Sequence, residues 1–172
     1  QGCTVLCALS GGADSMALVS GLLAVAEDRD LTVLAAHYDH QLRGEESRRD
    51  ADFVRTWCAS RGIPLTMGTG DVAARAAQTG RGIEETARDM RYAFLAQTAE
   101  ALGAHAIATA HNANDNAESF FLNLLRGCGL NGLCAIPPRR GHIVRPLLTT
   151  PRRDIEAYLT AHGLPHTEDD SN

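Results

Sequence analysis

A short run rich in glycine and serine directly follows an apolar stretch near the start of the chain. Residues 5–9 read VLCAL, and residues 10–15 read SGGADS. Two adjacent glycines let the backbone turn sharply and come close to an anion, so that successive amide N–H groups can point at one phosphate group. The apolar-periodic stretch that follows predicts a helix, whose N-terminus adds the positive end of its dipole. The predicted phosphate-binding residues are Ser10, Gly11, Gly12, Ala13, Asp14 and Ser15.

This loop differs from lysine-containing phosphate loops. All 16 basic residues are arginines, whereas a Walker-type loop needs a lysine that reaches the terminal phosphates. The absence of lysine also excludes a lysyl Schiff base and a lysyl-adenylate intermediate. The string SGGxDS resembles the pyrophosphate-binding loop of the N-type ATP pyrophosphatases, which cleave ATP between its α and β phosphates. Asp14 and Ser15 then have two compatible interpretations, as caps of the first helical turn or as ligands of Mg²⁺ and of pyrophosphate oxygens.

A second polar cluster, HYDH at residues 37–40, follows another apolar stretch. Two imidazoles and a carboxylate are legitimate metal ligands. Side chains alternate along a strand, however, so His37 and Asp39 share one side while His40 points elsewhere. A closed three-ligand site is therefore not expected. We predict that the backbone here lines the adenine pocket and that Asp39 faces the reacting phosphate or Mg²⁺.

A third cluster lies at the predicted start of another helix. His111, Asp115 and Glu118 are separated by four and then three residues, which places them on one helix face. Acidic residues at a helix N-terminus can simply suit the helix dipole. Beside an ATP loop, Asp115 and Glu118 could instead bind a cationic substrate or Mg²⁺.

Two arginines lie three residues apart, on or beside the apolar stripe of a long predicted helix. A charge in that position needs a partner. One interpretation of Arg88 and Arg91 is a salt bridge to Glu84 or Glu85. The other is that forked guanidinium groups clamp the α phosphate or neutralise the charge that develops as pyrophosphate leaves.

Short apolar stretches alternate with longer amphipathic ones, a pattern typical of a sheet with helices on both faces. We expect strands at residues 4–9, 31–37, 64–67, 104–110 and 143–147. We expect helices at residues 14–27, 45–61, 82–102, 114–126 and 152–162. The predicted fold is α/β, with an open, mostly parallel sheet of about five strands. Ligands bind outside the carboxyl ends of such strands, and all three polar clusters follow a predicted strand.

Two further expectations concern the connections and the packing. Residues 68–82, rich in glycine and alanine, should join the third strand to the long helix as a mobile segment with a short helical turn. Trp57 should pack its helix against the sheet.

Length and composition limit the class of protein. With 172 residues, of which 44% are apolar, the chain fits one domain covering residues 1–172. No apolar run approaches the roughly 18 residues that span a membrane, so we expect a soluble, cytoplasmic protein without membrane association. The start at Gln1 and the abrupt end at Asn172 suggest a chain truncated at both ends.

Charge and cysteine content narrow the class further. The net charge of −5 argues against a general nucleic-acid coat, although the arginine-rich residues 139–153 could form a local basic patch or a solvated loop. The cysteines are Cys3, Cys7, Cys58, Cys128 and Cys134. They contain no CxxC pair, so the sequence indicates neither a disulfide framework nor a cysteine zinc site. We expect these cysteines to serve as small core or near-surface residues. No heptad pattern predicts a dimer face, and the oligomeric state stays open.

Seven motifs together resemble the N-terminal catalytic domain of the tRNA(Ile)-lysidine synthase family, within the PP-loop superfamily. They span nearly the whole chain: SGGADS (10–15), HYDHQLRGEES (37–47), GIEETARDMRY (82–92), TAHNANDNAES (109–119), LLRGCGLNGL (124–133), RPLL (145–148) and EDDSN (168–172). SGGxDS is shared by several families, whereas RGxGxxGL followed by RPLL and DxSN is typical of this one. The resemblance implies a ligase that adenylates the wobble cytidine of a CAU-anticodon isoleucine tRNA at C2 and lets free L-lysine displace AMP. ATP is then the co-substrate, Mg²⁺ the cofactor, and this tRNA and L-lysine the partners.

The resemblance also implies a role for each candidate residue. The expected catalytic residues are Asp39, Arg88, Arg91 and Asp115. The expected ATP-binding residues are Ser10, Gly11, Gly12, Ala13, Asp14, Ser15 and His37. The expected metal ligands are Asp14, Asp39 and Asp115. The expected substrate-binding residues are His111, Glu118 and Arg126, with Glu118 facing the lysine ammonium group.

The fourth motif departs from the usual AHHADDQAET of the family. A histidine, an acid, a glutamine and a threonine are replaced by Asn112, Asn114, Asn116 and Ser119. Asn114 removes a charge near the expected metal or lysine site, whereas Asp115 and Glu118 remain.

Three alternatives differ in chemistry. A tRNA thiolase of the same superfamily would be expected to carry paired CxxC cysteines, and an amide-forming synthetase would share SGGxDS without RGxGxxGL and RPLL. A nucleotide-binding sensor would hold ATP without turning it over. Formation of AMP from ATP only when tRNA is supplied would separate the enzyme from the sensor.

Overall fold

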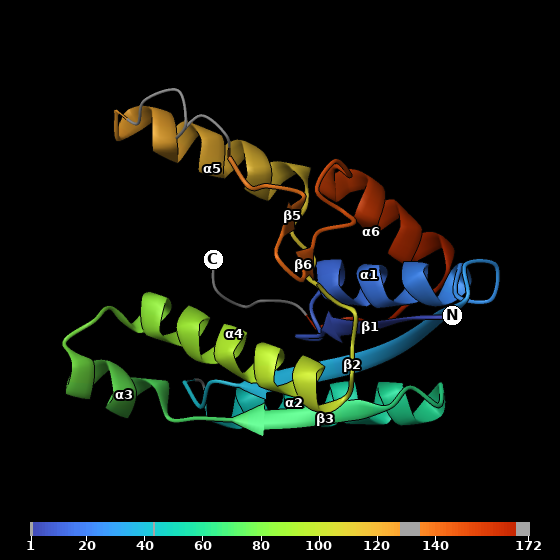
Figure 1. Cartoon of the computed structure of the whole chain (residues 1–172), viewed down its shortest axis with the longest axis horizontal. Helices are drawn as coiled ribbons and strands as arrows, with labels where there is room; N and C mark the ends of the chain where they lie inside the picture. The colour runs from blue at the N-terminus through green and yellow to red at the C-terminus, as the bar shows by residue number, and fades with distance from the viewer. Residues whose placement is uncertain (1, 43, 128–134, 168–172) are drawn as a thin grey trace.

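The computed structural model describes residues 2–42, 44–127 and 135–167 (Figure 1). The strands are β1 (Cys3–Ala8), β2 (Leu31–Asp39), β3 (Leu65–Thr69), β4 (Ala106–Ala108), β5 (Arg139–Arg140) and β6 (Ile143–Val144). The helices are α1 (Ala13–Ala24), α2 (Glu45–Ser60), α3 (Val72–Thr79), α4 (Ile83–Ala101), α5 (Ala113–Leu125) and α6 (Arg152–Ala161).

The described strands form one sheet in the order β3-β2-β1-β4-β6-β5. β1 pairs in parallel with β2 and β4, and β3 and β6 extend the sheet in parallel. Among these strands only β5 is antiparallel, pairing with β6. The predicted α/β fold with an open, mostly parallel sheet is confirmed. The sheet has one strand more than expected because β5, two exposed arginines, has no apolar pattern that could reveal it.

The central strand β1 is buried between two layers of helices. Val5 and Cys7 belong to the core cluster that contains residues of α1, α2 and α6. Leu6 points to the other face and packs with Leu95 and Ala99 of α4. Helices therefore cover both faces of the sheet, as Figure 1 shows, which explains why β1 is apolar at successive positions rather than alternating.

Trp57 and three cysteines lie where the composition suggested. Trp57 is 4% exposed in the cluster that joins α2 to β1 and β2, so its predicted packing is confirmed. Cys7 and Cys58 are buried in the same cluster, and Cys3 packs against it. Burial raises the pKa of Cys7 to about 12 and that of Cys58 to about 11, so both thiols are unreactive at neutral pH. Cys128 and Cys134 lie outside the described residues.

Residues 68–82 contain a regular helix, α3, where a mobile connection with a short turn was expected. The Asp71 side chain caps it by accepting a hydrogen bond from the Ala74 N–H at 2.8 Å. Gly80 ends it in the left-handed conformation, with φ of 67°. α3 then packs against α4. The aspartate and the glycine were the local signals for this helix.

The five helices expected from periodicity are all present. Their bounds agree with the expected ones to within three residues, and the largest difference is the end of α1 at Ala24 rather than at residue 27. β4 and β6 are shorter than expected. In the ranges that the structure describes, no helix is both long and apolar enough to cross a membrane.

Candidate active site

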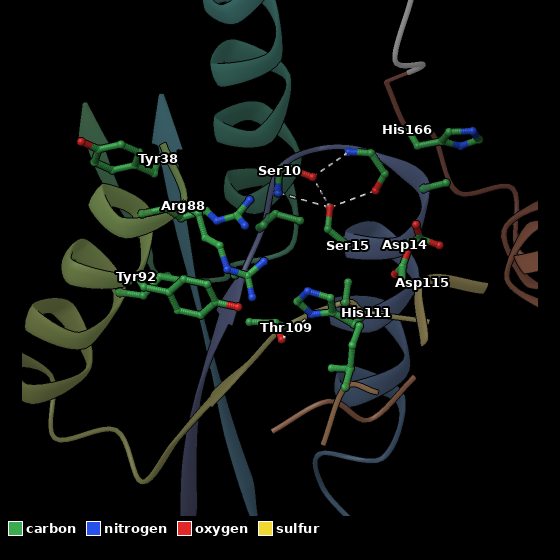
Figure 2. A pocket seen from close by; sticks show the side chains of 18 of the residues that line it. Ser10, Asp14, Ser15, Tyr38, Arg88, Tyr92, Thr109, His111, Asp115 and His166 are labelled. Atoms are coloured by element: carbon green, nitrogen blue, oxygen red, sulfur yellow. Dashed lines mark hydrogen bonds between the residues drawn. The ribbon is translucent and has the colours of Figure 1, made fainter. Parts of the chain in front are cut away.

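The carboxyl ends of β1, β2 and β4 open into one cleft of about 1080 Å³. Ser10 follows β1, Tyr38 lies near the end of β2, and Thr109 follows β4. Side chains of α4 form one wall, and residues at the starts of α1, α5 and α6 form the other (Figure 2). The structure thus brings the loop after β1 and the cluster after β4 to the same cavity.

Ser15 organises the loop after β1. Its Oγ accepts hydrogen bonds from the N–H groups of Ser10 and Gly11, each at 3.2 Å, and donates to the Gly12 carbonyl at 2.9 Å. The Ser10 Oγ accepts a hydrogen bond from the Gly12 N–H at 3.3 Å. Serine hydroxyls therefore hold three amides of the predicted phosphate loop, and these hydroxyls can rotate and release the amides to a stronger, anionic acceptor.

The N-terminus of α1 has no side-chain cap, because its N-cap residue is Gly12. The first helical hydrogen bond runs from the Met16 N–H to the Gly12 carbonyl at 3.1 Å. The N–H groups of Ala13, Asp14 and Ser15 accordingly have no acceptor within the helix. Together with the helix dipole, they make this end of α1 a binding site for an anion.

Gly11 is held against the C-terminal part of the described chain. Its φ is 100°, which favours glycine. Its carbonyl accepts a hydrogen bond from the Thr167 N–H at 2.9 Å. A Cβ at this position would lie 3.2 Å from the Thr167 Oγ1 and 3.3 Å from a methyl group of Val54. The loop backbone therefore has little freedom to accept a larger residue here.

The α4 wall of the cleft is cationic. The Arg88 and Arg91 guanidinium groups lie 5.2 Å and 5.7 Å from the centre of the Tyr92 ring. Neither of them pairs with a carboxylate of the described residues, and Glu85, one expected partner, pairs with Arg81 instead. Burial lowers the pKa of Arg91, and the nearby Arg88 lowers it further. Two adjacent cations without a described counter-charge favour the phosphate-clamp interpretation over the salt bridge.

The opposite wall carries Asp14, Asp115 and Glu118. Burial raises the pKa of Asp14, Arg152 and the nearby Asn112 side chain lower it, and Asp115 raises it again. The Asp14 Oδ2 accepts a hydrogen bond from the Arg152 Nη1 at 2.7 Å. The Asp14 Oδ1 is buried and accepts no hydrogen bond from the described residues.

Asp115 caps α5 and also lines the cleft. Its Oδ2 accepts a hydrogen bond from the Asn112 N–H at 2.9 Å. The Asn112 Oδ1 accepts in return from the N–H groups of Asn114 and Asp115, at 2.8 Å and 3.1 Å. This reciprocal capping box fixes the start of α5 and the direction of the Asp115 side chain.

The asparagines that distinguish the fourth motif make contacts with backbone groups. Asn112 is the N-cap of α5. The Asn114 Oδ1 accepts a hydrogen bond from the Arg152 N–H at 3.1 Å, and the Asn116 Oδ1 accepts one from the Ile136 N–H at 2.9 Å. The amide oxygens thus attach α5 to the next segments of the chain without adding a charge to the cleft.

His111 lies on the floor of the cleft. Its Nδ1 is 3.1 Å from the Thr109 Oγ1. Burial lowers the pKa of His111, and the cations Arg145, Arg88 and Arg91 lower it further, whereas Asp115 raises it. The imidazole is therefore neutral at pH 7 and can accept a proton.

Four predicted site residues do not line this cleft, and Gly11, whose backbone is held by Thr167, is one of them. His37 and Asp39 line a smaller cavity of about 320 Å³ that shares Ser10 and Arg91 with it. The Asp39 Oδ1 accepts a hydrogen bond from the Gln41 N–H at 2.8 Å. Arg126 follows the last turn of α5 and lines neither cavity.

The predicted three-carboxylate metal site is not assembled by the protein alone. Asp14 and Asp115 share the cleft, whereas Asp39 lies at the neighbouring cavity. Within residues 2–42, 44–127 and 135–167, no three His, Cys, Asp or Glu side chains are grouped so that they could hold a metal ion. The physical reason is the alternation along β2, which turns Asp39 away from the cleft that Tyr38 faces.

Several lining residues had no role in the sequence analysis. The hydroxyl of Tyr92 is buried without a hydrogen-bond partner among the described residues and belongs to the cleft (Figure 2). Arg152, Glu156 and His166 also line it. The position of Tyr92 beside two arginines on the same helix was the only local signal for any of them.

The arginine-rich residues 139–153 do not form one surface patch. Arg145 is 6% exposed, and its Nη1 donates to the Pro137 carbonyl at 2.6 Å. Arg152 reaches into the cleft. The motif at residues 168–172 and residues 128–133 of LLRGCGLNGL lie outside the described part of the chain.

Comparison with known proteins shows which proteins this chain resembles in sequence. A model of the PP-loop domain matches residues 1–172. Proteins named tRNA(Ile)-lysidine synthase are similar: one from Thermotoga sp. (strain RQ2) is 41% identical over 172 residues, covering 100% of this chain and 41% of that protein. One from Porphyromonas gingivalis (strain ATCC BAA-308 / W83) is 43% identical over 169 residues, covering 98% and 36%. One from Chlorobaculum tepidum is 41% identical, covering 100% and 52%. The chain therefore spans 36% to 52% of the length of these relatives.

Solved structures show the same fold at lower identity. The U34-tRNA thiolase of Methanococcus maripaludis, with its [4Fe-4S] cluster, has a TM-score of 0.80 at 17% identity, covering 98% of this chain and 60% of that one. The NH3-dependent NAD synthetase of Campylobacter jejuni has a TM-score of 0.62 at 20% identity, covering 95% and 66%. At these identities the likeness concerns the fold alone.

Proposed function

The chain belongs to the PP-loop domain family, and on that premise we propose that it is the ATP-using domain of an enzyme that forms lysidine in tRNA. The proposed reaction joins free L-lysine to C2 of the wobble cytidine in a CAU-anticodon isoleucine tRNA and releases AMP and pyrophosphate. The names of the similar proteins support this substrate class. The observation that carries the proposal is the division of charge in the cleft, with Arg88 and Arg91 of α4 on one wall and the phosphate loop, Asp115 and Glu118 on the other.

In the first half-reaction, the cytidine O2 attacks the α phosphorus and pyrophosphate leaves with the bonding electron pair. Negative charge then grows on the departing phosphates. In this proposal the free N–H groups at the start of α1 and the guanidinium groups of Arg88 and Arg91 stabilise that charge, which their position in the cleft lining supports. The unpartnered Tyr92 hydroxyl supplies a further donor on the same wall. The adenosine end extends toward the smaller cavity, along the backbone at His37 and the side chain of Asp39.

The residues of the second wall fit a Mg²⁺ ion. The Asp14 Oδ1 is an unpartnered, buried carboxylate oxygen in the phosphate loop, and Asp115 lies close enough to raise the pKa of Asp14. Carboxylate oxygens are the ligands that Mg²⁺ prefers, usually one or two together with phosphate oxygens. Asp14 and Asp115 would hold the ion, which when bound would offset phosphate charge.

In the second half-reaction, the lysine amine attacks C2 and AMP leaves with the bonding electron pair. Glu118 and Asp115 attract the ammonium form of lysine into the cleft. The amine must lose a proton to attack, and the neutral His111 on the cleft floor can accept it. No covalent bond to the enzyme is needed, because adenylation already gives C2 a good leaving group.

The test is the product formed from ATP, MgCl2 and labelled L-lysine by the longest natural form of the protein, with and without a CAU-anticodon isoleucine tRNA. We expect AMP and labelled tRNA together, both lost when this tRNA is omitted. AMP with tRNA but no incorporated lysine would refute lysine as the nucleophile and leave base adenylation. No AMP under any condition would refute turnover and favour a nucleotide sensor. Action on tRNA would also place the protein in the cytoplasm.

A further inference from the structure

Arg152, the first residue of α6, reaches along one wall of the cleft to the phosphate loop. Its Nη1 donates to the Asp14 Oδ2 at 2.7 Å, and its Nε donates to the Glu156 Oε1 at 3.0 Å. Its backbone N–H donates to the Asn114 Oδ1 at 3.1 Å. The residue is therefore anchored by its backbone to α5, while its side chain joins α6 to the start of α1.

The ion pair between Arg152 and Asp14 is exposed enough for another cation to take the place of the guanidinium group. The Arg152 side chain is 44% exposed and that of Asp14 is 23% exposed, so the guanidinium can turn without unpacking the core. Arg152 uses only one oxygen of Asp14. The other, Oδ1, is buried in the cleft without a hydrogen-bond partner among the described residues. Asp14 thus presents to an incoming cation a second oxygen that has no hydrogen bond of normal geometry, although the Asn112 side chain lies close enough to lower the pKa of Asp14.

A divalent cation and Arg152 would compete for Asp14. Two positive charges on one half-buried carboxylate repel each other more strongly than they would in water. Glu156, one turn along the same helix, offers the guanidinium a second carboxylate, so release from Asp14 does not leave it unpaired. The forked guanidinium also suits a phosphate oxygen pair bound at the start of α1, whose first turn contains Asp14 itself.

We propose that Arg152 is a positioning residue that serves as the built-in counter-ion of Asp14. It holds the carboxylate in place before ATP binds, yields it to Mg²⁺, and then pairs with the phosphate that enters with the metal. The exchange couples the binding of Mg²⁺ and phosphate in both directions. Mg²⁺ at Asp14 releases Arg152 for the phosphate, and phosphate at Arg152 frees Asp14 for the metal. The inference rests on the proposed function for the nucleotide and the metal, but it requires neither tRNA nor lysine.

The experiment compares the wild-type chain with R152Q and with R153Q, a neighbouring control whose exposed side chain pairs with Asp154. Mn²⁺ is titrated without nucleotide, and free Mn²⁺ is measured by electron paramagnetic resonance. Inorganic pyrophosphate is titrated separately in EDTA. For R152Q we expect about threefold to tenfold tighter Mn²⁺ binding, because a competing charge is removed, and about tenfold weaker pyrophosphate binding, because a charge-assisted contact is lost. R153Q should match wild type in both.

Unchanged or weaker Mn²⁺ binding by R152Q would overturn the proposal, as would equal changes in R153Q or a wild-type chain that binds no Mn²⁺. If R152Q does not fold, R152K decides, since it keeps the charge but not the fork. It should bind Mn²⁺ like wild type and pyrophosphate more weakly, and the opposite pattern would contradict the exchange. Tighter Mn²⁺ binding by R152Q together with no lysine transfer to tRNA would refute the proposed function and leave this inference standing.

Discussion

The imidazole of His37, on β2, is hydrogen-bonded to the carbonyl of Leu9 at the end of the neighbouring strand. Its Nδ1–H donates across 2.8 Å, and the side chain is 6% exposed. Leu9 immediately precedes the phosphate loop, so this bond sets the direction in which the chain leaves the sheet. The bond thus fastens the His37 imidazole behind the loop, at the edge of the smaller cavity.

Replacing His37 should loosen the loop. We expect His37→Ala to lower the free energy of unfolding by about 2–4 kcal/mol, because it leaves a buried carbonyl without its partner and opens a cavity. ATP affinity should fall as well. Denaturant unfolding and ATP titration measure the two effects. The matched control is His162→Ala, which removes a similar bond, 2.9 Å to the Tyr158 carbonyl, at the exposed end of α6. Equal effects of the two variants would contradict the role assigned to His37.

The cationic wall should matter for ATP chemistry more than for stability. We expect Arg91→Gln to reduce kcat/KM for AMP formation by about 10²–10³, because it removes charge that stabilises the departing pyrophosphate. Stability should hold or rise, since the substitution relieves repulsion from Arg88. The control is Arg81→Gln, which breaks exposed pairs with Glu85 and Asp89 outside the cleft. Its activity should equal that of wild type in a steady-state assay. A large loss of folding stability in Arg91→Gln would instead indicate a structural role.

The parts of this molecule that the sequence predicts are those set by local patterns. Apolar periodicity predicts α4, because one face of this helix must pack on the sheet. The SGGADS string predicts a tight turn because glycine tolerates a positive φ, and Gly11 indeed adopts φ of 100°. The order of the polar clusters at strand ends follows from the parallel topology. These features depend on neighbours within a few residues.

The parts that could not be predicted depend on contacts distant in sequence. Asp14 and Arg152 are 138 residues apart, and nothing in either local pattern indicates that they pair. β5 has two residues and exists only because β6 lies beside it. The position of Asp39 at a second cavity likewise depends on how far β2 extends past β1, because residues 37–39 pair with β3 alone. Residue types suggested the chemistry, and the tertiary structure decided which groups share a cleft.

Gly70 is a point where any side chain would collide with a residue of the cleft. A Cβ there would lie 2.2 Å from the Tyr38 hydroxyl oxygen and 2.6 Å from the Met90 methyl group. We expect Gly70→Ala to cost about 1–3 kcal/mol of stability through overpacking and to weaken ATP binding, because Tyr38 lines both cavities.

The control for Gly70→Ala is Gly21→Ala on α1, where no heavy atom lies within 4 Å of the added methyl group. That change should raise stability by about 0.5–1 kcal/mol, because alanine favours the helix. Thermal or denaturant unfolding of both variants gives the comparison. If Gly70→Ala changes neither stability nor ATP affinity, the Tyr38 side chain can move aside for the added methyl group, and the prediction is wrong.

The neutral state of His111 should appear in the pH dependence of stability. Its pKa in the folded protein lies below the ordinary 6.5, chiefly because of burial and then because of Arg145. The unfolded chain therefore binds a proton at a pH where the folded protein does not, so the stability present above pH 6.5 is lost as the pH falls toward the folded pKa. His111→Asn should show a shallower decline than wild type over this range in denaturant titrations at stepped pH. His40, whose pKa burial and Arg91 also lower, should account for part of the remaining slope, and His40→Asn measures that part. Identical slopes for wild type and His111→Asn would mean that the folded protein binds a proton at His111 as readily as the unfolded chain, which would remove the basis for its role as proton acceptor.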